Sequence, residues 1–263
     1  MPISEQFKTA LGSSKPLFGH WVGLPDPSAV EVMSGLPCDF LLLDGEHAPI
    51  APNDLYRLLP AADLHARPVV FRPRSKNEAD IKAALDAGVA GVMVPMVETA
   101  QQARAVVETA YYTPKGKRGV GPLRASNYYD DFGAYLAAAD AGTSVIVQIE
   151  SADGLTNADA IAAIDGVDAL FVGPADMAQS LKVPIGDFSG ALLEACATIA
   201  ATARRHGKCA AMDLLDPADA GKFLGLGFTV FTHGSDFGFL QETGRRTCNA
   251  LRAAFAAAGG PKG

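Results

Sequence analysis

The stretch Val145-Ile146-Val147-Gln148-Ile149-Glu150, followed by Ser151, sets the pattern for the chain. Five of its six residues suit a buried strand, and the sixth, Glu150, is a carboxylate placed where the strand should end and a loop begin. A second apolar run, Ala169–Val172, leads through Gly173-Pro174-Ala175 to another carboxylate, Asp176. Two strands that each release an acid at the C-terminal end suggest a divalent metal held between them.

Apolar runs bounded by turn residues recur along the whole chain. They are apolar at successive positions and not at every second one, which predicts strands covered on both faces and hence a parallel sheet. Eight such runs are present: Leu17–Val22, Phe40–Leu43, Pro68–Phe71, Gly91–Val94, Val145–Ile149, Ala169–Val172, Cys209–Met212 and Phe228–Phe231.

Helix signals lie between these runs. Asp26-Pro27 and Asp216-Pro217 have the form of an N-cap followed by proline at the first helical position. Asn77 opens another helix, and Gly88 ends it. Pro60 is expected to interrupt the helix in which it falls. Two further helices are expected at Glu98–Tyr111 and Leu192–His206.

Eight strand–helix units without a charged linker predict a single (β/α)8 TIM-barrel domain over residues 1–263. The alternative, a doubly wound open sheet, would be favoured by a Gly-rich dinucleotide loop after the first strand, but Val22-Gly23-Leu24-Pro25 does not have that form. The aperiodic segment Thr113–Tyr129 is either a lid or binding loop or an exposed solvated loop. The tail Leu240–Phe255 has apolar residues at helical spacing and is expected to cap the barrel or to dock on a partner subunit.

Composition limits the classes of function. The chain has 263 residues, of which 49% are hydrophobic, and a net charge of −7. Nucleic-acid binding needs clustered Lys and Arg and is not expected. The four cysteines show no CxxC pairing, the N-terminus lacks a signal pattern, and no uncharged apolar run reaches the roughly 20 residues of a membrane helix. We therefore expect a cytoplasmic protein with reduced cysteines and no membrane partner.

In a barrel of this kind the working residues lie at the C-terminal ends of the strands. Two carboxylates without a thiolate or His cluster suit Mg²⁺ or Mn²⁺, although each acid could instead cap a helix or form a salt bridge. Arg72 could stabilise an oxyanion or form a salt bridge with Asp44. His47 could act as a base or lie on a surface loop. The polar residues at the strand ends are His20-Trp21, Asp44-Gly45-Glu46-His47, Arg72, Gln148, Glu150 and Gly173–Asp176.

Lysines are absent from the ends of the candidate strands. An aldolase that works through a Schiff base needs a buried lysine at such a position. That route is therefore not expected.

Six segments together resemble the HpcH/HpaI family of metal-dependent pyruvate aldolases, which includes 4-hydroxy-2-oxoheptanedioate aldolase and 2-dehydro-3-deoxyglucarate aldolase. The match runs in order from about residue 17 to residue 236. The resemblance implies reversible cleavage of a 4-hydroxy-2-oxo acid to pyruvate and an aldehyde, with no organic cofactor. The segments are LLLDGEHAP (41–49), VVFRP (69–73), VMVPMVE (92–98), GKRGVG (116–121), VQIES (147–151) and FVGPADM (171–177).

By resemblance, Glu150 and Asp176 are the ligands of a divalent ion, which is Mg²⁺, Mn²⁺ or Co²⁺. Gln148 and the backbone at Ala175-Asp176 hold pyruvate. The other substrate-binding residues that the resemblance implies are Trp21 and Gly173.

The resemblance also assigns catalytic roles. Arg72 stabilises the enolate oxygen, His47 acts in general acid–base steps, and Asp44 lies near the oxygen of the aldehyde. The family pairs its histidine with an aspartate that matches Asp86. Asp86 ends a helix antiparallel to the strands, so we expect it at the opposite end of its own barrel from His47. The two can then meet only across a subunit interface, which fits the family's hexamer with the C-terminal segment, about 236–258, exchanged between neighbours.

Other readings stay open. One is a related lyase, either an oxaloacetate decarboxylase or a CoA-thioester enzyme similar to the citrate lyase β subunit. Another is a non-catalytic, metal-dependent binder of oxo acids. His20, the segment Pro122–Asp131 and the segment Met212–Asp216 depart from the family pattern. These regions shape the aldehyde pocket, so the acceptor aldehyde stays undetermined.

Overall fold

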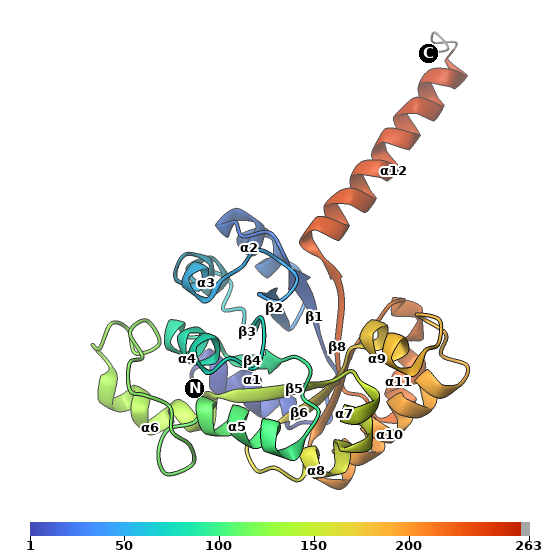
Figure 1. The fold of residues 1–263 in the computed structure, drawn as a ribbon. Helices are drawn as coiled ribbons and strands as arrows, with labels where there is room; N and C mark the ends of the chain where they lie inside the picture. The colour runs from blue at the N-terminus through green and yellow to red at the C-terminus, as the bar shows by residue number, and fades with distance from the viewer. Residues whose placement is uncertain (259–263) are drawn as a thin grey trace.

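The computed structural model describes residues 1–258, and its centre is a closed barrel of eight parallel strands (Figure 1). Each strand pairs with the next along the chain, and β8 pairs with β1 to close the ring. The (β/α)8 TIM barrel is therefore confirmed, and the open sheet is excluded. Residues 259–263 of the expected domain lie outside the described part of the chain. The strands are β1 (Leu17–Val22), β2 (Phe40–Asp44), β3 (Val69–Arg72), β4 (Gly91–Val94), β5 (Ser144–Ile149), β6 (Ala169–Val172), β7 (Cys209–Asp213) and β8 (Val230–Ser235).

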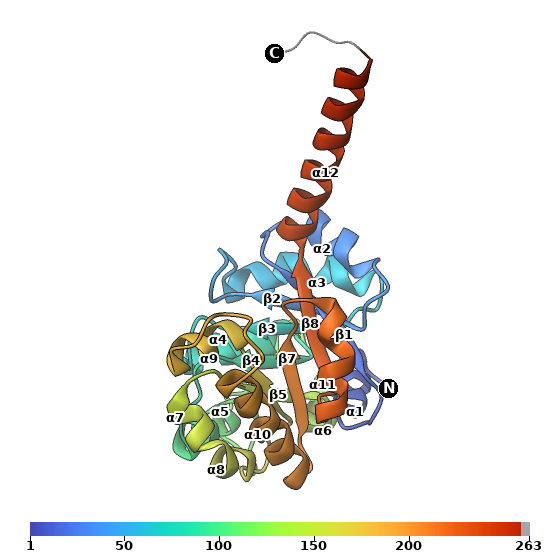
Figure 2. The same ribbon diagram turned by 90° about the vertical axis from the view of Figure 1, so that its right-hand side faces the viewer.

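Helices surround this barrel (Figures 1 and 2). The predicted start signals are confirmed, because the side chains of Asp26 and Asn77 each accept a hydrogen bond from the backbone amide two residues later. Gly88 ends its helix with a φ of 99°, as predicted. Asp216 caps a short 3₁₀ turn and not an α-helix. The helical elements are α1 (Ile3–Leu11), α2 (Pro27–Ser34), η1 (Pro52–Asp54), α3 (Leu55–Asp63), α4 (Glu78–Ala87), α5 (Ala100–Ala110), α6 (Phe132–Gly142), α7 (Ala152–Thr156), α8 (Ala158–Ala162), α9 (Pro174–Leu181), α10 (Ala191–Arg205), η2 (Pro217–Asp219), α11 (Ala220–Leu226) and α12 (Asp236–Ala257).

Apolar side chains form two layers, one inside the barrel and one between the strands and the helices. The helix α1 closes the N-terminal end of the barrel with Phe7 and Leu11, both buried. The Phe7 ring lies 5.4 Å from the ring of Phe40 on β2. Burial of such a side chain contributes about 1.5–3 kcal/mol.

The helix α3 runs through Pro60, so the expected interruption there is wrong. Leu55, Leu58 and Leu59 on this helix are buried, and their burial stabilises it. Pro60 itself is exposed. The carbonyl that loses its amide partner to proline therefore lies toward solvent, where water can satisfy it.

The strand β8 begins later and ends later than the apolar run Phe228–Phe231 predicts. Phe228 belongs to the turn after α11, since its amide donates to the carbonyl of Phe223 and the two rings lie 5.9 Å apart. The strand then continues through the polar residues Thr232–Ser235, which pair with β1 as far as Trp21. Polar composition hid this extension, which reaches the rim of the barrel.

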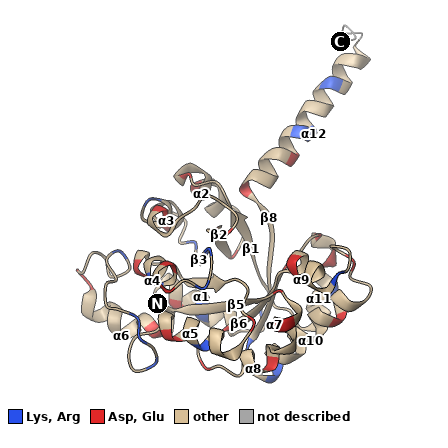
Figure 3. Cartoon of the chain, viewed as in Figure 1, with Lys and Arg blue, Asp and Glu red and all other residues tan. Residues whose placement is uncertain are grey.

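The helix α12 leaves the barrel as one long rod of 22 residues (Figures 1 and 2). Only Asp236 of this helix is buried, and its carboxylate accepts hydrogen bonds from the amides of Gly23 and Leu24. Charged positions punctuate the rod in Figure 3. Between them Leu240, Leu251 and Phe255 are 67%, 51% and 63% exposed. Among the described helices, none combines the length and the apolar composition that crossing a bilayer requires.

The segment between α5 and α6, residues 111–131, lies at the N-terminal end of the barrel, because α5 runs back from the end of β4 and β5 starts after α6. Arg118 within this segment is buried and pairs with Asp86 at the end of α4. The segment is therefore an anchored loop, and within one chain it does not cover the C-terminal ends of the strands.

Candidate active site

A cavity of about 200 Å³ opens at the C-terminal ends of the strands. Sites for drug-sized ligands have volumes of about 300–1,000 Å³, so this smaller cavity suits small substrates. It collects residues that are distant in sequence, and most of the predicted site residues are among them. The lining consists of Trp21, His47, Arg72, Gln148, Phe171, Gly173, Pro174, Ala175, Asp176, Asp213 and Leu215.

Glu150 follows β5 directly beside this cavity and is only 3% exposed. Its Oε1 accepts a hydrogen bond of 2.8 Å from the Met96 amide, and its Oε2 accepts one of 2.9 Å from Gln148 Nε2. Gly173 leaves the room for this carboxylate, because a Cβ at that position would lie 2.5 Å from Glu150 Oε2. The Oε1 of Gln148 is buried without a hydrogen-bond partner. The site thus holds a buried carboxylate and an unsatisfied amide oxygen.

The electrostatics of this corner favour a cation. Burial is the main cause that raises the pKa of Glu150 to about 7. The negative charges of Asp176 and Glu46 contribute to this rise, and the hydrogen bond from the Met96 amide opposes it. Within residues 1–258 no group of three or more His, Cys, Asp or Glu side chains is arranged to hold a metal. Two carboxylates and an amide oxygen nevertheless fit a hard ion such as Mg²⁺ or Mn²⁺, which leaves other positions to water and substrate oxygens.

Arg72, at the end of β3, is fixed on three sides. Its Nε and Nη2 donate to the two carboxylate oxygens of Asp44 at 2.9 and 2.8 Å, and its Nη1 lies 3.1 Å from Glu46 Oε2. Its guanidinium stacks on the ring of Trp21 at 4.3 Å. Burial acts to raise the pKa of Asp44, but the bonds and charge of Arg72 outweigh it and lower that pKa. Arg72 therefore makes the salt bridge to Asp44, which was one of the two alternatives, and it also faces the cavity.

His47 lies at the edge of the cavity on the loop after β2, and its side chain is 65% exposed. The backbone amide of His47 donates to Asp44 Oδ1, as does that of Glu46. Its Nε2 lies 3.6 Å from Glu46 Oε2. Asp44 thus orients both the loop that carries His47 and the guanidinium of Arg72.

Two residues of the site received no role from the sequence alone. Glu46 lies inside the quoted DGEHAP segment, and burial raises its pKa against the opposing charge of Arg72. Asp213, the last residue of β7, lines the cavity, and burial raises its pKa against its hydrogen bonds from Thr232 and Trp21. The signal available for Asp213 was its position directly after the apolar run Cys209–Met212.

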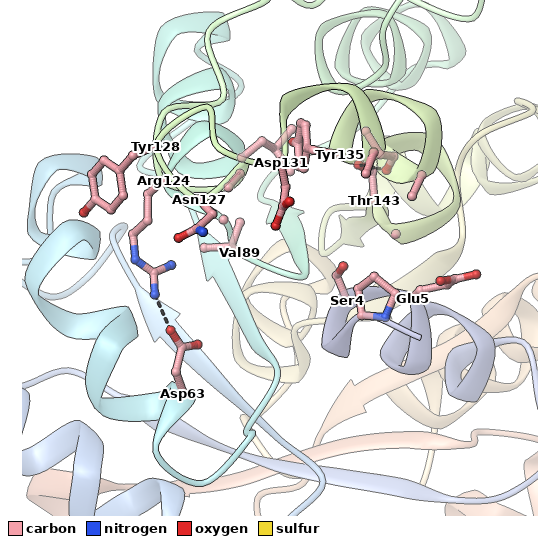
Figure 4. A pocket seen from close by; sticks show the side chains of 18 of the residues that line it. Ser4, Glu5, Asp63, Val89, Arg124, Asn127, Tyr128, Asp131, Tyr135 and Thr143 are labelled. Carbon is pink, nitrogen blue, oxygen red and sulfur yellow. Dashed lines mark hydrogen bonds and ion pairs between the residues drawn. The ribbon is translucent and has the colours of Figure 1, made fainter.

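Asp86 does not join these residues. It ends α4 at the opposite end of the barrel, where its Oδ1 pairs with Arg118 at 2.5 Å. Burial raises the pKa of Asp86 against that arginine. Arg118 also lines a second cavity, of about 720 Å³. Figure 4 shows this cavity. Although larger, this cavity contains no strand-end acid, and its Arg124 is already paired with Asp63.

Comparison with known proteins adds the family. The model of the HpcH/HpaI aldolase/citrate lyase family matches residues 17–242. The chain belongs to this family. A hydroxypyruvate/pyruvate aldolase of Deinococcus radiodurans is 39% identical over 252 residues, which are 93% of this chain and 88% of the relative. A 5-keto-4-deoxy-D-glucarate aldolase of Klebsiella pneumoniae is 36% identical over 94% of this chain and 96% of the relative.

A solved structure agrees with this assignment. A HpcH/HpaI aldolase/citrate lyase family protein from Burkholderia cenocepacia superposes with a TM-score of 0.87 at 33% identity, covering 94% of this chain and 99% of that one. As a member of the HpcH/HpaI family the protein is an enzyme of the aldolase type. The alternative of a non-catalytic binder is thereby set aside.

Proposed function

We propose that the protein is a divalent-metal-dependent aldolase that reversibly cleaves a 4-hydroxy-2-oxo acid to pyruvate and an aldehyde. The observation that carries the proposal is Glu150, a carboxylate only 3% exposed with no cationic side chain among its hydrogen-bond partners. Glu150 and Asp176 would hold the ion. When bound, the ion would polarise the 2-oxo group and stabilise negative charge on it.

The protein's own groups orient the 2-oxo acid. The helix α9 begins at Pro174, so the amides of Ala175 and Asp176 have no partner within the helix and can donate to a carboxylate. The buried amide of Gln148 faces the same space. Arg72, held by Asp44 and supported by Trp21, presents a fixed positive charge to the enolate oxygen that forms as the C3–C4 bond breaks.

The proton of the 4-hydroxyl goes to His47, directly or through water. His47 is placed at the edge of the cavity and is exposed enough to exchange protons with solvent. Asp44 fixes the loop on which it lies. In the condensation direction the same groups take a proton from the pyruvate methyl group.

The helix α12 supports an oligomer. Leu240, Leu251 and Phe255 share one face with Gly244 and Thr247, at helical spacing, and nothing in the described chain covers that face. A stripe of this kind is stabilised when a second copy buries it. We assign α12 to contact with a neighbouring subunit in a hexamer, in which each chain forms one barrel domain. The four free cysteines suit a protein of the cytoplasm.

Asp86 fits a site shared between subunits. Its Oδ1 is held by Arg118, while its Oδ2 accepts no hydrogen bond within the described chain. Leu85, the residue before it, and Arg118, its partner, line the larger cavity, which a neighbour's strand-end loops would cover. In this arrangement Oδ2 accepts a hydrogen bond from the imidazole of His47 across the interface.

Proton exchange at pyruvate tests the chemistry. The protein is incubated with pyruvate in D₂O, with Mg²⁺ or Mn²⁺ and then with EDTA, and the methyl signal is followed by NMR. Exchange that depends on the ion is expected, and Glu150→Gln should abolish it. Glu31→Gln, the same change at an exposed position on α2, should not alter it. Absence of exchange with every divalent ion would rule the proposal out.

Mixing two inactive variants tests the shared site. Asp86→Ala and His47→Ala should each lose activity. Because an intact site then needs His47 from one variant and Asp86 from the other, a mixture of the two should recover up to about one quarter of wild-type activity. No recovery after subunit exchange, or full activity of Asp86→Ala alone, would contradict the shared site.

The role of α12 has its own test. Leu251→Glu should dissociate the oligomer in light scattering, whereas Asn249→Glu, which adds the same charge on the opposite face, should leave it intact. A fully active monomer would contradict the shared site as well.

A further inference from the structure

We propose that Asp213 selects the aldehyde partner, and that it favours uncharged aldehydes carrying a hydroxyl on the carbon next to the carbonyl. The inference rests on the proposed aldolase function and names the substrate class of that site. It starts from the hydrogen bonds of Asp213, which leave one carboxylate oxygen for a ligand.

Both hydrogen bonds that the Asp213 carboxylate accepts go to the same oxygen. Trp21 Nε1 donates to Oδ1 at 2.8 Å, and Thr232 Oγ1 donates to it at 2.6 Å. Within the described chain Oδ2 accepts none, and it is not among the atoms sealed away from solvent without a partner. Asp213 lines the cavity. Its carboxylate is therefore fixed through one oxygen and open through the other.

The register of the strands places Asp213 in the same layer as the ion-binding corner. Ile149 pairs with Val172, and Val172 pairs with Met212, so Glu150, Gly173 and Asp213 follow at one level on β5, β6 and β7. Two strand spacings of about 4.8 Å put Asp213 roughly 10 Å from Glu150. A ligand whose 2-oxo acid end lies at Glu150 can therefore reach Asp213 with its aldehyde-derived end, because Asp213 and Gly173, which lies against the Glu150 carboxylate, line the same cavity.

The chemistry of Oδ2 decides what that end should carry. An acceptor oxygen in a cavity wall is satisfied by a hydroxyl of the ligand. A methyl group that displaces water from this oxygen leaves it unpaired, so an alkyl aldehyde is disfavoured. A carboxylate at the same place would meet a like charge in a site of low dielectric. A hydroxylated, uncharged aldehyde meets neither penalty.

A purely structural role for Asp213 predicts different behaviour. Trp21 stacks under Arg72, so Asp213 could serve only to hold that ring. Loss of such a support would slow every aldehyde alike. If Oδ2 selects the aldehyde, loss of the Asp213 carboxylate instead changes the ratio of the kcat/KM values for different aldehydes. The chain contains one tryptophan, so its fluorescence reports directly on whether the Trp21 ring has moved.

The test measures kcat/KM for addition of pyruvate to three aldehydes of two carbons: glycolaldehyde, acetaldehyde and glyoxylate. The wild type should prefer glycolaldehyde. In Asp213→Leu the ratio of glycolaldehyde to acetaldehyde should fall about 10- to 100-fold, the usual effect of losing a hydrogen bond to a charged group. A ratio within one variant does not depend on how much of the protein is active.

Asp213→Asn keeps the shape of the side chain and the acceptor at Oδ1, and it guards against a leucine variant that fails to fold. Removing the charge should raise the ratio of glyoxylate to acetaldehyde about tenfold. Unchanged ratios in both variants, or a wild type that prefers acetaldehyde or glyoxylate, would overturn the inference. If the wild type shows neither pyruvate exchange nor product with any aldehyde, the proposed function fails and the inference with it.

Discussion

Replacement of Glu150 by glutamine should make the metal-free protein more stable at alkaline pH, although it removes a predicted ligand. Burial raises the pKa of Glu150 from its usual 4.5 to about 7, and the residue is 3% exposed. The folded chain therefore holds this proton more tightly than the unfolded chain. The contribution to stability is complete below pH 4.5 and is lost as the pH rises through about 7. At about 1.4 kcal/mol per pKa unit, the loss at pH 8 is about 3 kcal/mol.

Glutamine avoids this loss because it carries no charge. Its amide oxygen can keep the hydrogen bond from Met96. If the side-chain amide of Gln148 flips, the NH₂ group of the new glutamine can donate to Gln148 Oε1, which has no partner in the wild type. The free energy of unfolding of the variant should exceed that of the wild type by about 3 kcal/mol at pH 8 and by less than about 1 kcal/mol at pH 5.

Urea unfolding in EDTA at one fixed protein concentration measures this difference at both pH values. The control is Glu31→Gln, the same substitution at an exposed position on α2, which should unfold like the wild type. Added Mg²⁺ or Mn²⁺ should reverse the order, because an ion at 1,000 times its Kd stabilises the wild type by about 4.1 kcal/mol and the variant lacks a ligand. A Glu150→Gln variant that is no more stable than the wild type at pH 8 in EDTA would show that Glu150 is already compensated, and the reasoning would be wrong.

Three further results are expected. Gly173→Ala should abolish ion-dependent pyruvate exchange, because its Cβ would lie 2.5 Å from Glu150 Oε2; titration calorimetry that finds unchanged ion affinity would contradict this. Asp44→Asn should destabilise the fold by about 3–5 kcal/mol, since it breaks the buried pair with Arg72, and an unfolding curve unchanged from wild type would refute that role. The ion's Kd should rise about tenfold per pH unit below about pH 7 and level off above it, because Glu150 must lose its proton to bind; a Kd that is flat from pH 5.5 to 8.5 would exclude Glu150 as a ligand.

The fold was predictable because strands that are buried on both faces appear in the sequence as continuous apolar runs. Three of the eight runs, such as Ala169–Val172, coincide with the strands. The misses have physical causes. β8 extends through Thr232–Ser235, where backbone pairing with β1 continues without apolar side chains. Pro60 stays within α3 because its face is exposed.

The site was less predictable than the fold. The residues in the quoted motifs were named, and Trp21, Arg72, Gln148 and Asp176 do come together at one cavity. The network that holds them was not visible, because it depends on contacts between strands far apart in sequence. From the sequence alone, Asp213 is an acid next to a loop. Its place in the cavity wall becomes clear only from the hydrogen bonds that it accepts from Trp21 and Thr232.

The exposed rod α12 has a thermodynamic consequence. At about 1.5 Å per residue it extends roughly 33 Å, and every residue of the helix from Leu240 onward is exposed in the described chain. An isolated helix of this kind is marginal in water, since most helical stability in proteins comes from packing. In the proposed oligomer, the ordering of α12 and the arrival of a neighbour that covers Leu251 and Phe255 are linked equilibria. The helix content of this segment should then rise with protein concentration, so that it measures the fraction of chains in the oligomer.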